Sequence, residues 1–286
     1  MIDTDRRIRE HWAARDNVRS MAAALAVGDS RLERPTVEDL APRDQLHAGT
    51  IEATARFVDW AGVGPGQRVL DLGSGLGGSA RFLASRTGVR VTALELCDGL
   101  HDTAAELTRR CGLSHLVDHV RGDGTRPTDI GGGGFDVIWI QHVDMQVRDK
   151  AGLYATVARC LAPGGRVVWH DWLAGAGGAP RWPVFWSEDG AISFHIPEAE
   201  FRDNLRRAGL TLARFEVIAD ETMTWFGKGR REIAAARSSL RAKSPPPLER
   251  LRKLEHLLLE MDNAILNTRE ERLIPFFAEA RAEANS

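Results

Sequence analysis

Runs of apolar residues alternate with segments of helical periodicity through the middle of the chain. Strands that alternate with helices at this spacing are typical of a parallel sheet with right-handed crossovers. The run at 135–140, Phe-Asp-Val-Ile-Trp-Ile, has the composition of a central strand that is buried on both faces. The predicted strands are 68–72, 91–95, 117–121, 135–140, 166–171, 211–219 and a last strand near 273–282.

Apolar residues at helical spacing predict helices before, between and after these strands. We therefore expect an α/β fold: a doubly wound, mostly parallel seven-stranded sheet of Rossmann-like type. An N-terminal helical cap (1–62) precedes the main domain (63–286), which carries a helical insertion at about 222–270. The predicted helices are 8–27, 50–61, 78–86, 99–111, 149–161, 197–208, 225–241 and 248–267, and the predicted loops are 31–43, 122–134 and 172–194.

Composition and charge argue against several classes of function. The 286 residues include 38 basic and 40 acidic side chains, so there is no excess of positive charge for nucleic acid. No apolar run approaches the roughly 20 residues that span a bilayer, and the N-terminus does not look like a signal peptide. Three cysteines without a Cys-x-x-Cys pair are typical of free thiols in a reducing compartment, and we expect a cytoplasmic protein.

A glycine cluster, Asp71-Leu-Gly73-Ser-Gly75-Leu-Gly77, follows the first predicted strand and precedes a helix. This geometry lets a nucleoside ligand lie against bare backbone at a helix N-terminus. Glu95 ends the next strand, about 20 residues further on, where a carboxylate can accept both ribose hydroxyls of an adenosine. The glycine spacing is one residue tighter than in dinucleotide-binding motifs, which suits adenosine attached to an amino acid better than adenosine attached to a pyrophosphate.

This cluster resembles motif I of the class I S-adenosylmethionine-dependent methyltransferases, and later parts of the chain follow the order of that superfamily. An acid, Asp123, comes after the third strand, Gln141 ends the fourth, and Leu161-Ala-Pro-Gly-Gly precedes the fifth. The sequence is most similar to the small-molecule branch, which includes sarcosine/dimethylglycine N-methyltransferases and tocopherol and sterol C-methyltransferases. His47-Ala-Gly before the domain and the late helical insertion support this branch.

The resemblance implies S-adenosyl-L-methionine as the cofactor. A side chain at Gly73 or Gly75 would collide with the methionyl moiety, whose carboxylate is favoured by the backbone N–H groups at the helix start. By resemblance, Asp123 accepts a hydrogen bond from the adenine amino group while the Gly124 backbone meets the ring edge. The predicted cofactor-binding residues are Gly73, Ser74, Gly75, Glu95, Leu96, Asp123, Gly124 and Gln141.

The methyl group of the cofactor is already activated, so the protein mainly has to align the nucleophile. An alcohol or phenol needs a base, an amine at most loses a proton, and a carbon nucleophile needs a stabilised charge. His142, His170 and Asp171 follow the fourth and fifth strands, at the edge of the sheet where ligands bind, and are the predicted catalytic residues. A purely structural role is the alternative for each. We expect no metal, because these residues lack a metal-ligand spacing.

Aromatic residues in the predicted loop 172–194 can wall a pocket and exclude water, although they could instead anchor that loop. The predicted substrate contacts are His47, Asp144, Trp182 and Trp186. The resemblance to the N-methyltransferases implies a methyltransferase acting on nitrogen or oxygen of a small-molecule metabolite. A C-methyltransferase, or a cofactor-binding protein of this fold without methyl transfer, is the alternative. We expect no nucleic-acid or membrane partner, and a homodimer stays open.

Overall fold

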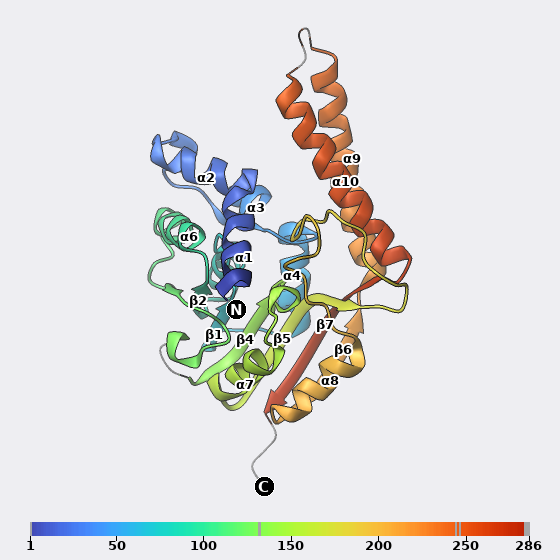
Figure 1. Ribbon diagram of the computed structural model, residues 1–286. Helices are drawn as coiled ribbons and strands as arrows, with labels where there is room; N and C mark the ends of the chain where they lie inside the picture. The colour runs from blue at the N-terminus through green and yellow to red at the C-terminus, as the bar shows by residue number, and fades with distance from the viewer. Residues whose placement is uncertain (1, 131–132, 244, 246, 283–286) are drawn as a thin grey trace.

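The computed structural model describes residues 2–130, 133–243, 245 and 247–282, built around a seven-stranded sheet of order β3-β2-β1-β4-β5-β7-β6 (Figure 1). The pairs among β1 to β5 are parallel, whereas β7 runs antiparallel to both of its neighbours. The predicted mostly parallel, seven-stranded α/β sheet is therefore confirmed. The strands are β1 (Arg68–Leu72), β2 (Arg90–Glu95), β3 (Val117–Arg121), β4 (Phe135–Gln141), β5 (Leu161–Ala174), β6 (Leu210–Val217) and β7 (Leu273–Ala282).

Successive side chains of the central strands contribute alternately to two hydrophobic clusters, one on each face of the sheet. Ile138 and Ile140 of β4 pack with Phe201 on one face, while Val137 and Trp139 of the same strand pack on the other. Successive strand residues point to opposite faces, so a strand covered by helices on both sides must be apolar throughout. The helices are α1 (Ile2–Ala14), α2 (Asp16–Ala26), α3 (Val37–Asp44), α4 (Thr50–Ala61), α5 (Gly78–Thr87), α6 (Asp98–Arg110), α7 (Lys150–Cys160), α8 (Glu198–Arg207), α9 (Ala219–Arg241) and α10 (Leu248–Arg269), with short 3-10 turns at Ser30–Leu32, Pro127–Ile130 and Asp144–Gln146.

Two sequence predictions for the N-terminal cap are wrong. The predicted helix 8–27 is two helices, because Arg15 has an extended backbone that separates α1 from α2. The predicted loop 31–43 contains α3, whose start is fixed by a capping box between Thr36 and Asp39. This reciprocal pair satisfies two backbone N–H groups and outweighs the charges and prolines that suggested a loop.

A buried ion pair fastens the cap to the main domain. The Arg81 guanidinium on α5 donates to the Asp44 carboxylate at the end of α3 over 2.7 Å, and both side chains are fully buried. The same guanidinium also donates to the backbone oxygens of Leu76 and Ala104 and to the Thr108 hydroxyl. These partners lie on α3, on the loop before α5 and on α6, so Arg81 of α5 holds these segments together.

Helices α9 and α10 lie side by side between β6 and β7 in the chain and project away from the sheet (Figure 1). Phe226 of α9 is buried against Trp172 and Trp186, so the base of this helix pair packs on the segment that follows β5. In the described part of the chain, none of the helices combines the length and the apolar character that crossing a membrane requires.

Candidate functional site

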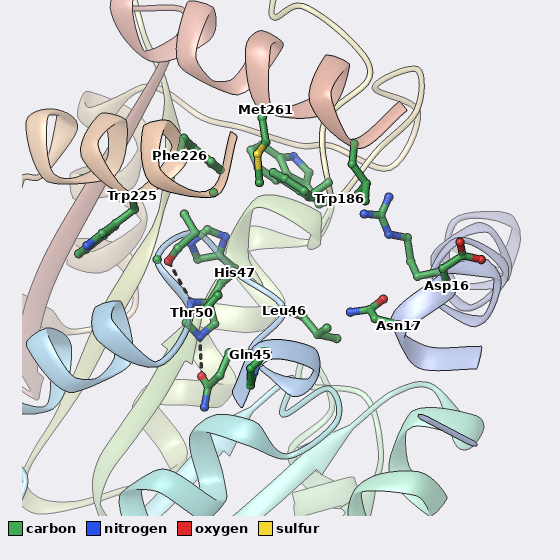
Figure 2. Close-up of a pocket in the computed structure, with 18 of the residues that line it drawn as sticks. Asp16, Asn17, Gln45, Leu46, His47, Thr50, Trp186, Trp225, Phe226 and Met261 are labelled. Carbon is green, nitrogen blue, oxygen red and sulfur yellow. Dashed lines mark hydrogen bonds between the residues drawn. The ribbon is translucent and has the colours of Figure 1, made fainter. Parts of the chain in front are cut away.

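A cavity of about 1010 Å³ lies between the cap, the segment after β5 and the bases of α9 and α10. Its lining is rich in aromatic and apolar side chains from segments that are far apart in the sequence. Figure 2 shows Trp186, Phe226 and Met261 on one side of it and His47, Gln45 and Leu46 on the opposite side. A cavity of this size and lining is typical of a site that encloses a small organic molecule.

Three imidazoles cluster beside the cavity, at the carboxyl ends of β4 and β5. The His142 ring centroid lies 4.7 Å from that of His170 and 5.6 Å from that of His47. His142 has a positive φ of 58°, which a non-glycine residue adopts only when its surroundings enforce it. Its backbone N–H donates to the His170 carbonyl over 2.8 Å. Of the three, His47 and His142 line the cavity, while His170 lies behind them.

The protonation of His142 follows from its neighbours. Burial lowers its pKa well below the ordinary value of 6.5, and nearby His47 lowers it further, so the ring is neutral. The Trp172 indole donates to His142 Nδ1 over 3.4 Å. Because a neutral imidazole carries one proton, this bond places the proton on Nε2, which has no partner among the described residues. His142 therefore carries a buried N–H group without a partner among the described residues.

We expect ¹⁵N NMR at about pH 5.5 to give the neutral signature for His47, His142 and His170. Burial lowers the pKa of His47 to about 4, and burial together with the neighbouring imidazoles lowers that of His170 well below 6.5. Each ring therefore takes up its second proton only at a pH below that of an ordinary histidine. His142 should also show the Nε2–H tautomer. A doubly protonated His142 at that pH would contradict this electrostatic description.

Asp171 and Asp144 support the loop after β4 and do not line the cavity. The fully buried Asp171 carboxylate accepts the backbone N–H groups of Val143, Asp144 and Trp172, each over 2.8 Å. Burial, and then the charge of Asp144, raise the pKa of Asp171 to about 7. The Asp144 carboxylate itself accepts bonds from Lys150 and Tyr154 over 2.6 Å. Both acids thus hold the backbone that forces His142 into its unusual conformation.

The two predicted tryptophan contacts have different positions. Trp186 is buried and lines the cavity. Trp182 packs against Gly190, where an added Cβ would approach its ring to 2.7 Å, and it is not among the residues that line the cavity. Of these two tryptophans, Trp186 is the one placed to contact a molecule in the cavity.

The glycine loop after β1 is the predicted cofactor-binding segment, and Glu95 holds its backbone. Gly73 and Gly75 have positive φ values of 76° and 57°, and an added Cβ at Gly73 would lie 2.5 Å from the Val143 side chain. The buried Glu95 carboxylate accepts the backbone N–H of Gly75 over 2.7 Å and that of Cys97 over 2.8 Å. Burial raises the pKa of Glu95. The carboxylate thereby fixes the loop that the sequence predicts to contact the cofactor.

The remaining predicted cofactor-binding residues differ in whether their polar groups already form hydrogen bonds within the protein. Asp123 accepts the backbone N–H and the hydroxyl of Thr125, and an added Cβ at Gly124 would approach Leu72 to 2.8 Å. The Gln141 amide bonds with Ser79, Trp139 and His170. The Leu96 carbonyl accepts a bond from Arg9 of α1, whereas the buried Ser74 hydroxyl has no partner among the described residues.

Two contacts show that the glycine loop adjoins the cavity. Leu46 lines the cavity, and its side chain lies 3.5 Å from where a Cβ on Gly75 would stand. Val143, which packs on Gly73, directly follows the cavity-lining His142. A ligand on the glycine loop would therefore end close to His142.

Apart from His47, sequence analysis did not single out the lining residues that come from the cap and from the insertion. The signals were weak: Trp12 falls on the apolar face of a predicted helix, and Trp225 and Phe226 stand at the start of another. In the fold, all three reach one cavity. The rim also brings ligand-type atoms of Glu188, His256 and Glu260 within 4.8 Å of one another. Glu260 already pairs with Arg15 over 2.5 Å, and this pair joins the cap to α10.

The chain shows clear similarity to known proteins. Residues 70–169 match the family model described as "Methyltransferase domain". A glycine/sarcosine/dimethylglycine N-methyltransferase of Actinopolyspora halophila is 28% identical over 65% of this chain and 33% of its own length. Phosphoethanolamine N-methyltransferase 1 of Arabidopsis thaliana is 34% identical over 58% of this chain and 30% of its own length. The chain thus spans about a third of these curated relatives.

The fold is also found among solved structures. Phosphoethanolamine N-methyltransferase 2 of Haemonchus contortus, solved with phosphomonomethylethanolamine and S-adenosylhomocysteine, superimposes with a TM-score of 0.73. The match covers 96% of this chain and 60% of that chain at 16% identity. At this identity the superposition establishes a shared fold, and it includes the cap as well as the sheet.

Proposed function

We propose that this chain, a member of the class I S-adenosylmethionine-dependent methyltransferase superfamily, methylates nitrogen or oxygen of a small-molecule metabolite. The observation that carries the proposal is the pair of adjoining sites: a glycine loop fixed by Glu95, and a large aromatic cavity that meets it at Leu46 and His142. One site suits an adenosine cofactor and the other an organic acceptor.

The residues of the glycine loop fit S-adenosylmethionine, which supplies a methyl group activated by the sulfonium charge. Gly75 leaves its backbone open on the side where a Cβ would lie, whereas Val143 packs against Gly73, and the unpaired Ser74 hydroxyl could bond to the amino-acid end. Glu95 would accept the ribose hydroxyls with the lone pairs that the N–H groups of Gly75 and Cys97 do not use. In this proposal Asp123 and Gly124 border the adenine.

On the acceptor side, His142 is the proposed catalytic residue, since it alone of the predicted three lines the cavity. His170 and Asp171 act through it: one accepts its backbone N–H, and the other holds the two residues that follow it. The aromatic walls exclude water and align the acceptor, which is most of what transfer of an activated methyl group requires. The free cysteines of the described chain support the proposed cytoplasmic location.

Titration calorimetry and a turnover assay test the proposal. We expect the protein to bind S-adenosylhomocysteine and S-adenosylmethionine in preference to NAD, because the glycine spacing is too tight for a pyrophosphate. With S-adenosylmethionine and a library of hydroxylated and amino compounds, methylated product and S-adenosylhomocysteine should appear in equal amounts. Preferred binding of NAD would overturn the proposal. Cofactor binding without product from any compound would favour a non-transferring protein of this fold.

A further inference from the structure

We propose that the acceptor is a large, uncharged and mostly apolar molecule, of the size of a polycyclic compound, which fills the cavity between the cap and the α9–α10 pair. The inference rests on the proposed methyl transfer and deepens it by naming the class of acceptor. Four features of the cavity support it: its volume, the side chains of its inner wall, the hydrogen bonds of its polar groups and the position of its charges.

The volume of the cavity is large for a metabolite of a few heavy atoms. At about 1010 Å³ it is at the upper end of the range for small-molecule sites. None of the predicted cofactor-binding residues, all of them described by the structure, is among the lining residues. The space therefore lies beside the predicted cofactor-binding segment, and an acceptor as small as phosphoethanolamine would leave most of it unfilled.

The inner wall, which we define as the lining residues that are buried or half-buried, is mainly aromatic and aliphatic. Phe185 and Phe226 stack with their ring centroids 5.9 Å apart, and Met261 of α10 packs on the same cluster (Figure 2). Trp12 of the cap and Trp225 of α9 line the cavity as well. Covering these surfaces removes apolar area from water, and a large apolar framework covers more of them than a small polar molecule can.

Polar groups of the inner wall already form hydrogen bonds within the protein. The Trp12 indole donates to the Gln146 side chain over 3.0 Å. Both ring nitrogens of His47 lie within hydrogen-bond distance of protein oxygens, at 3.1 Å from the Ala48 carbonyl and 2.9 Å from the Gln45 side chain. These groups therefore have little hydrogen-bonding capacity left for a polar acceptor, whereas the faces of their rings remain available to an apolar one.

Charged lining side chains lie at the mouth of the cavity, where several of them pair with one another. Lys228 of α9 pairs with Glu52 of α4, and these side chains are 53% and 55% exposed. Lys253 of α10 pairs with Asp16 of α2 over 3.2 Å, and this pair is exposed as well. Both pairs join the α9–α10 pair to the cap. Charges in these positions keep their hydration and partly neutralise each other.

The interior of the cavity lacks a charge that could hold an ionic acceptor. Among the described residues of the inner wall, Arg15 carries the one guanidinium, and no carboxylate or ammonium group belongs to it. The buried Glu260 carboxylate accepts from Arg15 over 2.5 Å and neutralises it. A zwitterion or a phosphoamine in these surroundings would lose its hydration without gaining an opposite charge.

The position of the reacting end also favours a large molecule. The cavity meets the glycine loop at Leu46 and His142, so the atom to be methylated would lie at this end. Phe226 and Met261 belong to the opposite wall, at the base of the α9–α10 pair (Figure 2). An acceptor that reaches both ends spans the cavity, and its two contacts fix the reacting group in place.

Equilibrium dialysis of the unaltered protein tests the inference with benzyl alcohol, 2-naphthalenemethanol and 1-pyrenemethanol, which differ in the number of fused rings. We expect 1-pyrenemethanol to bind at least tenfold more tightly than benzyl alcohol, because each added ring buries more apolar surface. 1-Pyrenecarboxylate and 1-pyrenemethylammonium, which add a charge to the same framework, should each bind at least tenfold more weakly than 1-pyrenemethanol. Phosphoethanolamine in excess should not displace 1-pyrenemethanol.

Two variants of α10 show whether these probes bind in the cavity. M261E places a carboxylate on the inner wall, so 1-pyrenemethanol should bind at least tenfold more weakly, whereas 1-pyrenemethylammonium gains an opposite charge and should bind more tightly than before. L259E is the matched control, because Leu259 lies on the same helix, is 47% exposed and does not line the cavity. It should bind every probe as the unaltered protein does. Opposite changes for two probes cannot result from a general loss of folding.

The inference is wrong if 1-pyrenemethanol does not bind, if it binds no more tightly than benzyl alcohol or than either charged pyrene, or if phosphoethanolamine displaces it. It is also wrong if M261E and L259E bind both uncharged and cationic pyrene equally well. The comparison of probes on the unaltered protein needs no variant to fold. Failure of S-adenosylhomocysteine to bind would count against the proposed methyl transfer, while the probe series reports on the cavity alone.

Discussion

Replacing Asp44 with alanine should lower the free energy of unfolding by about 3–5 kcal/mol. Among the described residues, Asp44 is the only carboxylate that pairs with the fully buried Arg81 guanidinium, and the variant removes it. Burying a charge without an opposite charge is far more costly than forming the pair is favourable. Because the pair joins α3 to α5, we expect the cap to loosen first. Urea denaturation followed by tryptophan fluorescence measures the loss.

Asp59→Ala is the matched control for this variant. Asp59 also pairs with an arginine over 2.7 Å, but its side chain and that of Arg86 are 64% and 41% exposed. An exposed pair contributes about 0–1 kcal/mol, so the control should unfold almost like the unaltered protein. The double replacement D44L with R81M should recover much of the lost stability, since it removes both buried charges. Equal losses for D44A and D59A would contradict the proposed role of the buried pair.

Replacing Glu95 with alanine should weaken S-adenosylhomocysteine binding by about 1–3 kcal/mol, because the ribose loses a charged acceptor. The structure adds a second reason: the carboxylate also accepts the N–H groups of Gly75 and Cys97, so the glycine loop loses its support. Calorimetry gives the dissociation constant. We expect E95Q, which keeps one acceptor oxygen, to lie between E95A and the unaltered protein.

Asp98→Ala is the control for the Glu95 replacement, because Asp98 lies close to the end of β2. Asp98 lies three residues further along, is exposed and has a weak ion pair with Arg9 of 3.8 Å. Its removal should change the dissociation constant very little. If E95A is folded and binds S-adenosylhomocysteine as tightly as the unaltered protein, the ribose is held by another residue and the proposed cofactor site must be revised.

The sheet could be predicted from the sequence because a strand buried on both faces must be apolar throughout. β4 shows this: its run from Val137 to Ile140 is wholly apolar and buried, and the structure moves the predicted end of the strand by only one residue, to Gln141. Exposed cap helices lack such a signal. In α3 the start is set by two hydrogen bonds between Thr36 and Asp39, which hydrophobic periodicity does not reveal.

For the candidate site, the sequence singled out His47, His142 and Trp186, which line the cavity. The glycine loop and Glu95 stay a prediction from spacing along the chain, to which the structure adds the bond between them. The state of His142 could not be predicted, because the bond that fixes its tautomer comes from Trp172, 30 residues later. Likewise, the roles of Asp144 and Asp171 depend on which of their neighbours donate to them, and the fold decides that.

The position of the cavity relative to residues 70–169 has a consequence for how such enzymes diverge. Of the residues that line the cavity, only His142 and Met145 lie within the segment that matches the family model. All the others come from the cap, the segment after β5 and the α9–α10 pair. If the cavity holds the acceptor as proposed, replacement of these outer segments can change the acceptor without any change in the inner segment, residues 70–169. Two chains with nearly the same inner segment can act in unrelated branches of metabolism.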